Sequence, residues 1–334
     1  MSGIVDWHTH WLSPRTLEFL RQRTQAPRIV RDENGGLGFE VNSSVLVETL
    51  PIGPSFHDPA TRLDHIEQAG IAHQVISWPT TLGVDAALGA DEARALFTLY
   101  NDDLAGLVRQ HPQRLSGLAV LSTADIEWSA RELERAHREL GLIGAVLPAG
   151  AFLNLEGARR LAPLFAVAQR LGSHIYLHTG LAHPSIPGQW AHPPAPDATH
   201  ARWLLESTSQ FAAAWITLGL SDFLDDYPDV SVQLAMLGGL LPTLLGIIEK
   251  QAPIERIRRL YVDSAILGTD PDTLALAVRH LGAERILFGS DYPLQSSVQV
   301  LQTLRAGRTD RTTLNTLLDS GQVLLEQIRE RQAR

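Results

Sequence analysis

Short apolar runs alternate with amphipathic stretches along most of this sequence. The runs have the length of single strands and carry few charged side chains, which is typical of parallel strands buried on both faces. Eight such runs occur, at residues 4–10, 74–79, 115–122, 144–150, 174–180, 230–237, 260–265 and 286–293. The helices predicted among them cover residues 91–110, 126–141, 156–171, 271–281 and 311–332. Eight strand-then-helix units in 334 residues predict one α/β domain, residues 1–334, folded as a (β/α)8 TIM barrel.

An open, doubly wound parallel sheet is the competing architecture. Such sheets usually carry a glycine-rich phosphate-binding loop directly after the first strand. The first strand here is followed by His8-Thr9-His10-Trp11 instead. The closed barrel is therefore the predicted fold.

Two segments interrupt the regular alternation. Residues 11–73 form a predicted insertion with a β-hairpin at residues 38–47 and a helix that begins at the N-cap Asp58 and ends at Gly70. Residues 181–200 follow the fifth strand and contain five prolines, three histidines and one tryptophan. Loops of this length inside a compact domain are often lids, so we predict a lid loop here.

Composition narrows the function classes. The chain has 28 basic and 37 acidic side chains and a net charge of −9, which disfavours nucleic acid and anionic membranes as partners. It has no cysteine, which excludes disulfides, thiolate metal sites and cysteine nucleophiles. The apolar run at residues 230–248 is interrupted by glycine, proline and polar residues, so a strand, a turn and a helix start explain it better than a membrane span. No signal peptide is recognisable, and we expect a cytoplasmic protein that acts on a small molecule.

Polar residues at strand ends predict a metal site. His8 and His10 are two residues apart in the first strand and therefore point to the same side. His178 lies in the fifth run and Asp291 in the eighth. Closure of a barrel places strand eight beside strand one, with strand five across the mouth, so the four side chains can converge on one divalent ion. Three imidazoles and one carboxylate suit Zn²⁺, with Mn²⁺ as the alternative.

These residues also carry a resemblance to a known family. The H-x-H pair, the histidine on strand five and the segment Gly289-Ser290-Asp291-Tyr292-Pro293 resemble the amidohydrolase superfamily. The likeness is to the amidohydrolase-related branch that contains aminocarboxymuconate semialdehyde decarboxylase and resorcylate-type decarboxylases. It implies a homodimer and a single metal ion held by His8, His10, His178 and Asp291. Members with two ions bridge them through a carboxylated lysine on strand four, whereas the only lysine of this chain, Lys250, follows strand six.

The sequence departs from that branch at two positions. Met236 stands where the semialdehyde decarboxylase has a proton-transferring histidine, and a thioether cannot carry a proton at neutral pH. Ile247 stands where the family has a substrate-binding arginine contributed across the dimer, so a carboxylate loses its fork-shaped partner there. Both changes argue against the aminocarboxymuconate compound itself as the substrate.

The resemblance favours one reaction over its rivals. We expect non-oxidative decarboxylation of a small unsaturated or aromatic carboxylic acid, with Asp291 as the acid–base group. The same residues are also compatible with a metal-dependent hydrolase or hydratase that activates water against an amide, a lactone or an enol. A noncatalytic barrel that binds a metal and a ligand is the third possibility.

Four further positions receive secondary roles. Arg62, Trp190 and Met236 are candidate substrate contacts, and Asp263 is a candidate for orienting a ligand histidine from behind. Three of these residues also have a structural explanation that involves no substrate or metal. Arg62 could form a surface salt bridge at a helix start, Trp190 could anchor the lid, and Asp263 could cap the following helix.

Overall fold

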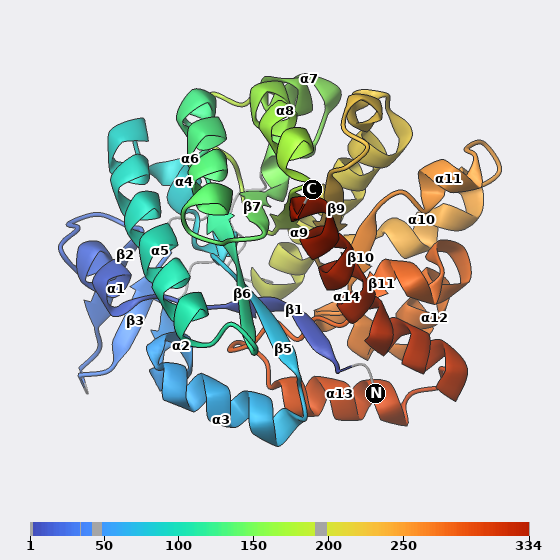
Figure 1. Ribbon diagram of the computed structural model, residues 1–334, viewed down its shortest axis with the longest axis horizontal. Coiled ribbons are helices and arrows are strands. Elements are labelled where there is room, and N and C mark those ends of the chain that lie inside the picture. The colour runs from blue at the N-terminus through green and yellow to red at the C-terminus, as the bar shows by residue number, and fades with distance from the viewer. Residues whose placement is uncertain (1–2, 34, 42–48, 191–198, 334) are drawn as a thin grey trace.

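Eight parallel strands form the centre of the molecule. The computed structural model describes residues 3–33, 35–41, 49–190 and 199–333. Among these residues the sheet has the order β1-β5-β6-β7-β8-β9-β10-β11 (Figure 1). Each barrel strand therefore pairs with the barrel strand that follows it in the sequence. The strands are β1 (Val5–His10), β5 (His73–Ser77), β6 (Leu115–Val120), β7 (Gly144–Pro148), β8 (His174–His178), β9 (Ser231–Leu234), β10 (Tyr261–Asp263) and β11 (Ile286–Leu287).

The barrel is closed by the chain that follows β11. The Trp7 amide donates to the Phe288 carbonyl at 2.9 Å, the Asp291 amide to the His8 carbonyl at 2.8 Å, and the His10 amide to the Tyr292 carbonyl at 2.7 Å. The eighth strand thus lies against the first, as a TIM barrel requires. The predicted (β/α)8 fold is confirmed.

Burial follows the prediction for parallel strands. Every residue of β1, β5, β6, β7, β8 and β9 is buried. Helices cover the outside of the barrel (Figure 1), and they therefore bury the outward face of the strands while side chains fill the inside. The helices are α4 (Val84–Ala87), α5 (Ala90–Gln110), α6 (Ile126–Arg138), α7 (Leu155–Arg160), α8 (Ala162–Leu171), α9 (Thr199–Leu220), α10 (Leu241–Ile248), α11 (Ile254–Ile257), α12 (Pro271–Leu281), α13 (Ser297–Ala306) and α14 (Arg311–Gln332).

Some helix boundaries differ from the prediction. The helix expected at residues 156–171 is divided into α7 and α8, with Pro163 in the first turn of the second helix, where its missing amide proton costs nothing. Helices α9 and α13 were not predicted, although Ser296, a residue type common at N-caps, precedes α13. The apolar run at residues 230–248 is the predicted strand, turn and helix start, namely β9, the 3-10 turn Met236–Gly238 and α10. No helix among the described residues is long and apolar enough to span a membrane.

The insertion contains more structure than expected. Its helices are α1 (Pro14–Arg21), α2 (Pro54–His57) and α3 (Pro59–Ala69), and its strands β2 (Arg28–Arg31), β3 (Leu37–Glu40) and β4 (Leu50–Ile52) form an antiparallel sheet. Strand β3 pairs antiparallel with β2 before it and with β4 after it. The predicted hairpin at residues 38–47 therefore begins in β3, but its described partner β4 starts only at Leu50, and residues 42–47 fall outside the described ranges. The predicted helix is α3, with the Asp58 carboxylate accepting from the Ala60 and Thr61 amides and Gly70 in the left-handed conformation at φ 66°.

One buried histidine predicts how stability depends on pH. His174 lies at the start of β8, with Nδ1 at 3.1 Å from Ser231 Oγ and Nε2 at 3.1 Å from Gln233 Oε1. Burial lowers the pKa of His174 from 6.5 to about 3. The unfolded chain therefore takes up a proton at this residue as the pH falls below about 6.5, while the folded chain does not, so stability is lost as the pH falls. This one group should lower the free energy of unfolding by about 1.4 kcal/mol per pH unit below that point.

Urea unfolding of the wild type and His174→Gln at about pH 7 and about pH 4.5 measures this contribution. The variant should lose less stability than the wild type between the two pH values. The exposed His200→Gln is the matched control and should follow the wild type. Equal pH dependence in His174→Gln and the wild type would contradict the prediction.

Candidate metal centre

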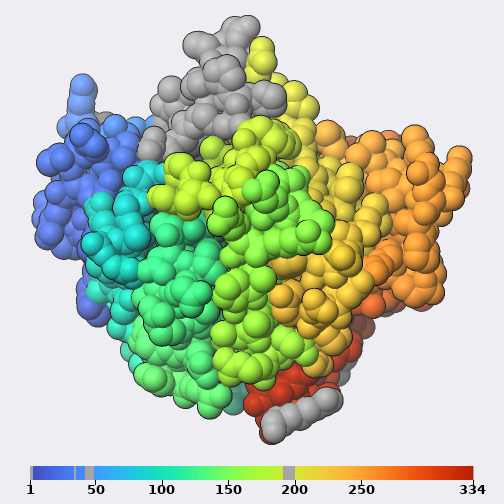
Figure 2. All heavy atoms as spheres, turned by 90° about the horizontal axis from the view of Figure 1, so that it is seen from above, coloured from blue at the N-terminus to red at the C-terminus, as the bar shows by residue number. Residues whose placement is uncertain are grey.

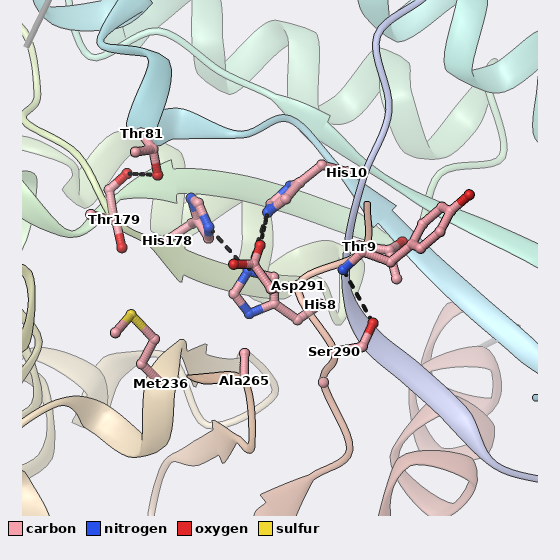
Figure 3. Close-up of polar contacts among 12 residues, drawn as sticks. His8, Thr9, His10, Thr81, His178, Thr179, Met236, Ala265, Ser290 and Asp291 are labelled. Atoms are coloured by element: carbon pink, nitrogen blue, oxygen red, sulfur yellow. Dashed lines mark hydrogen bonds and ion pairs between the residues drawn. The ribbon is translucent and has the colours of Figure 1, made fainter. Parts of the chain in front are cut away.

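Four side chains meet at the carboxyl ends of three strands (Figure 3). Nε2 of His8 lies 3.2 Å from Nε2 of His10 and 3.1 Å from Nε2 of His178. Oδ1 of Asp291 lies 3.3 Å from Nε2 of His8 and 3.2 Å from Nε2 of His10. All four residues are buried, and their ligand atoms lie within 4.8 Å of one another. The structure therefore brings together the four residues that the sequence predicts as ligands.

The backbone at Asp291 is held in an unusual conformation. Its φ of 67° lies in the left-handed region, which costs energy for a residue other than glycine. Three other non-glycine residues past neighbouring strand ends share this feature, namely Met236 at φ 55°, Leu237 at φ 54° and Ile266 at φ 54°. The hydrogen bond from the Asp291 amide to the His8 carbonyl keeps the carboxylate beside β1. Backbone strain is thus concentrated at the rim that carries the site.

Each imidazole is oriented through its other nitrogen. Nδ1 of His8 lies 3.1 Å from Oδ1 of Asp263, and Nδ1 of His10 lies 3.3 Å from the Ser77 carbonyl. Nδ1 of His178 lies 3.1 Å from Oγ1 of Thr80. A proton on each Nδ1 leaves each Nε2 with a free lone pair toward the centre, which is the form that binds a metal.

Asp263 contacts His8 from behind and does not cap α12. Its Oδ2 accepts from the Tyr176 hydroxyl at 3.1 Å and from Nε2 of Gln233 at 2.8 Å, inside the barrel. The cap of α12 is Asp270, whose carboxylate accepts from the Thr273 amide at 2.8 Å. The alternative of Asp263 as a helix cap is therefore wrong. Tyr176 and Gln233 were not named from the sequence, although polar side chains within otherwise apolar strands were the available signal.

The charges within the site are strongly coupled. Burial would raise the pKa of Asp291, but the adjacent His8 and His10 lower it below its ordinary value, so this carboxylate is ionised. Burial would also lower the pKa of His8, but the carboxylates of Asp263 and Asp291 raise it to about 10. Burial and the neighbouring imidazoles of His10 and His8 hold the pKa of His178 well below 6.5.

The donor set fits a divalent cation. Oδ1 of Asp291 is buried and makes no hydrogen bond of acceptable geometry, although two imidazole nitrogens lie close to it. Buried polar atoms normally find a partner, and a single proton on Nε2 of His8 cannot serve Asp291, His10 and His178 together. A divalent ion between them would satisfy the three imidazoles and the carboxylate together. Among the described residues, no second cluster of histidine and acidic side chains has this geometry, which agrees with a single ion.

Arg62 does not lie at the surface. Arg62 belongs to α3, and its side chain is fully buried. Its Nη1 donates to Oε1 of Gln74 at 2.9 Å, and its Nη2 donates to the carbonyl of His10. The alternative of a surface salt bridge is therefore wrong, because none of this side chain reaches solvent. Contact with a substrate stays a prediction.

Helix α3 also holds the segment around Asp291. The guanidinium of Arg62 lies 4.9 Å from the ring centroid of Tyr292, and the ring of His65 stacks on Tyr292 at 4.2 Å. The Ser297 amide donates to Nε2 of His65 at 3.3 Å. Because Arg62 binds His10 of β1 and contacts the neighbour of Asp291, one helix braces both sides of the barrel closure.

The remaining candidates lie in different surroundings. Met236 is buried beside the four ligands, where Ala265 also lies (Figure 3). Ile247 is 63% exposed on α10. Trp190 is half-buried, and its carbonyl accepts from Nε2 of Gln210 at 3.3 Å. A role for Trp190 at the substrate stays a prediction.

Only part of the predicted lid loop can be described. Residues 191–198 lie outside the described ranges, and α9 begins at Thr199. The first half is fastened by Gln189, whose Nε2 donates to the Ala182 carbonyl at 3.2 Å and the His183 carbonyl at 3.0 Å, and whose Oε1 accepts from the Ala182 amide at 2.8 Å. Hydrogen bonds from Gln189 therefore hold residues 182–189 in a compact turn.

Comparison with known proteins agrees with the fold and with the family resemblance. The model of the amidohydrolase family matches residues 5–308. The chain is 26% identical over 317 residues to 2-amino-3-carboxymuconate-6-semialdehyde decarboxylase of Dictyostelium discoideum, covering 86% of this chain and 81% of the relative. It is 29% identical over 263 residues to γ-resorcylate decarboxylase of Polaromonas sp. strain JS666, covering 70% of this chain and 77% of the relative.

A solved structure has the same architecture. Dihydroxybenzoic acid decarboxylase from Polaromonas sp. JS666, with bound manganese and the inhibitor 2-nitroresorcinol, superposes with a TM-score of 0.66. The match covers 98% of this chain and 97% of that one at 20% identity. This likeness supports the barrel fold.

Replacing Arg62 should destabilise the fold. In Arg62→Met the His10 carbonyl and the Gln74 amide oxygen lose a charged donor inside the protein, and we expect a loss of about 3 kcal/mol in the free energy of unfolding. Urea unfolding measures the loss. Arg285→Met is the matched control, because Arg285 also lies 4.9 Å from an aromatic centroid, that of Tyr261, but is only half-buried. It should lose less than about 1 kcal/mol, and a similarly small loss in Arg62→Met would contradict a bracing role.

Proposed function

The chain belongs to the amidohydrolase family, and on that premise we propose that it is a metal-dependent decarboxylase. The reaction would remove CO₂ from a small unsaturated or aromatic carboxylic acid without an oxidant. The observation that carries the proposal is the convergence of His8, His10, His178 and Asp291 at the carboxyl ends of the strands. The relatives named above, which are decarboxylases, support the choice of reaction.

The metal site is the first element of the proposed mechanism. We assign His8, His10, His178 and Asp291 as the ligands of one divalent ion. When bound, the ion supplies positive charge that attracts the substrate's carboxylate and stabilises the negative charge left when CO₂ departs. The nitrogen-rich donor set favours Zn²⁺, and the manganese-bound decarboxylase with the same fold supports Mn²⁺ as the alternative.

Asp291 is the proposed carrier of the proton. Loss of CO₂ breaks a carbon–carbon bond and leaves the electron pair on carbon, which must then receive a proton. Asp291 is ionised and faces the centre, so it can relay a proton from water to that carbon, and the hydroxide that the water leaves can combine with the released CO₂ as bicarbonate. Met236, which lies beside the ligand cluster in Figure 3, has no proton to give.

Met236 and Ala265 suggest the kind of substrate. Both contribute apolar atoms beside the ligand cluster, at the ends of β9 and β10 (Figure 3). An uncharged face of an aromatic or unsaturated acid packs well against a thioether and a methyl group. We therefore propose that the substrate directs its carboxylate to the ion and an apolar face to Met236.

Removal of the metal tests the proposed function. The wild type should release CO₂ from one of a panel of aromatic acids, with 2,6-dihydroxybenzoate and 5-carboxyvanillate as first probes. A chelator should abolish the release, and Zn²⁺ or Mn²⁺ should restore it.

Asp291→Asn should lower the rate by at least about a hundredfold, because it removes both a ligand and the proton carrier. Asp270→Asn, the same change at the N-cap of α12, is the matched control, since asparagine also caps helices, and should retain most of the activity of the wild type. Release of CO₂ that survives complete removal of metal would contradict the proposal, and hydrolysis without CO₂ release would point to a hydrolase instead.

A homodimer is a further part of the proposal. Leu240 and Leu244 are each 39% exposed and Ile247 is 63% exposed, at spacings that place them on one face of α10. Ile254 of α11 is 47% exposed, and this segment projects from the side of the molecule, in orange in Figure 2. Apolar side chains in such a row favour burial against a second copy of the chain. A cytoplasmic location stays a prediction of the sequence.

Charge placed on this face should separate the two copies. Light scattering during gel filtration should give a dimer for the wild type and a monomer for the double variant Leu244→Glu, Ile247→Glu, because each glutamate would be buried without a partner. Val323→Glu, at a residue of α14 that is 50% exposed, is the control and should remain dimeric. A monomeric wild type would contradict the proposed assembly.

A further inference from the structure

Thr80 links two strand ends across the mouth of the barrel. It lies in the 3-10 turn Thr80–Leu82 after β5, whereas its partner His178 is the last residue of β8 and Thr179 follows that strand. Strands β6 and β7 separate β5 from β8 in the sheet. The contact is therefore not one between neighbouring strands, and it depends on the turn reaching across the barrel.

The approach of the two segments is close. Oγ1 of Thr80 donates to the Thr179 carbonyl at 2.7 Å, and Oγ1 of Thr81 donates to the same carbonyl at 3.4 Å. Gly180 has a φ of +149°, and a Cβ at this position would lie 2.6 Å from the Thr80 carbonyl oxygen. Only glycine fits this approach, because any side chain would push the turn away from β8.

The hydrogen bonds around Thr80 have a fixed direction. A threonine hydroxyl carries one proton, and a backbone carbonyl can only accept. Because the Thr80 proton goes to the Thr179 carbonyl, the hydroxyl oxygen offers only lone pairs to Nδ1 of His178, which lies 3.1 Å away. Nδ1 must therefore carry the proton, and Nε2, which points toward His8, keeps its lone pair.

The other two imidazoles have partners that need no such arrangement. Nδ1 of His8 faces a carboxylate oxygen and Nδ1 of His10 faces the Ser77 carbonyl, both of which accept by nature, although the Ser77 hydroxyl also lies 3.4 Å from Nδ1 of His10. A hydroxyl, in contrast, can donate or accept. The Thr179 carbonyl therefore decides the role of Thr80, and Thr80 decides the tautomer of His178.

We propose that Thr80 is a positioning residue that sets the tautomer and the orientation of His178, so that Nε2 of His178 is presented to the metal ion. Thr80, His178 and Thr179 are all buried, which shields this chain of hydrogen bonds from water. The inference rests on the proposed role of His178 as a ligand. It adds a residue that acts through its contact with His178.

Metal affinity tests the inference without any substrate. Metal-free, full-length wild type, Thr80→Val, Thr80→Ser and Thr81→Val are titrated with Zn²⁺ in competition with a coloured chelator. Thr80→Val keeps the shape of the side chain and removes the hydroxyl, so its affinity should fall by about 10- to 100-fold. Thr80→Ser restores the hydroxyl and should bind within about threefold of the wild type. Thr81→Val, which loses a contact to the same carbonyl but not to His178, should also stay within about threefold.

The outcomes separate the inference from the proposed function. Wild-type affinity in Thr80→Val, or an equal loss in Thr81→Val, would overturn the role of Thr80 while leaving the metal centre intact. Failure of the wild type to bind Zn²⁺ or Mn²⁺ would overturn the metal centre itself, and the inference with it.

If Thr80→Val does not fold, the wild type still gives an answer. Nitrogen NMR of histidine-labelled, metal-free protein reports which ring nitrogen carries the proton, and His178→Gln identifies the signal of His178. A proton on Nδ1 is the expected result, and a proton on Nε2 would overturn the inference.

Discussion

The closure between β1 and the chain after β11 is the constraint on which the site depends. Backbone hydrogen bonds from Trp7, His10 and Asp291 join the first and last strands. The same bonds place the carboxylate of Asp291 beside His8 and His10, in a backbone conformation that a free chain would avoid. Closing the barrel and assembling the donor set are therefore one event, and the stability of the whole domain holds the site together.

Three different supports surround the donor set. Asp263 holds His8 from inside the barrel, Thr80 holds His178 from across its mouth, and Arg62 holds the backbone of His10 from the covering helix α3. These supports belong to separate strand–helix units, so no single loop carries the geometry. The insertion between the first two strands is part of this framework, because α3 contacts both edges of the closure.

The sequence was sufficient to predict features that depend on the order of the strands. It was not sufficient where the position of a residue depends on packing between distant segments. The alternation of apolar runs is sufficient for the barrel, and barrel closure is sufficient to bring His8, His10, His178 and Asp291 together. The surroundings of Arg62 were not predictable in this way, because a helix start is usually exposed and only the packing of α3 on the barrel buries this residue. Thr80 follows a strand end, which was the available signal, but its partner lies on a strand that is not its neighbour. Helix α9 was not predicted, because it follows the proline-rich sequence 181–198, whose composition disfavours a helix.

The positions of the four metal-binding residues along the chain affect how the metal-bound protein unfolds. Two of them lie in the first strand and one lies in the last, so an ion that binds all of them fastens the beginning of the chain to its final third. Global opening of the barrel separates these segments, and it cannot be completed while the ion keeps its full set of bonds. The ion would then have to leave before the chain could unfold completely. The rate of proteolysis in a cell, which depends on unfolding, would therefore fall as more metal is available.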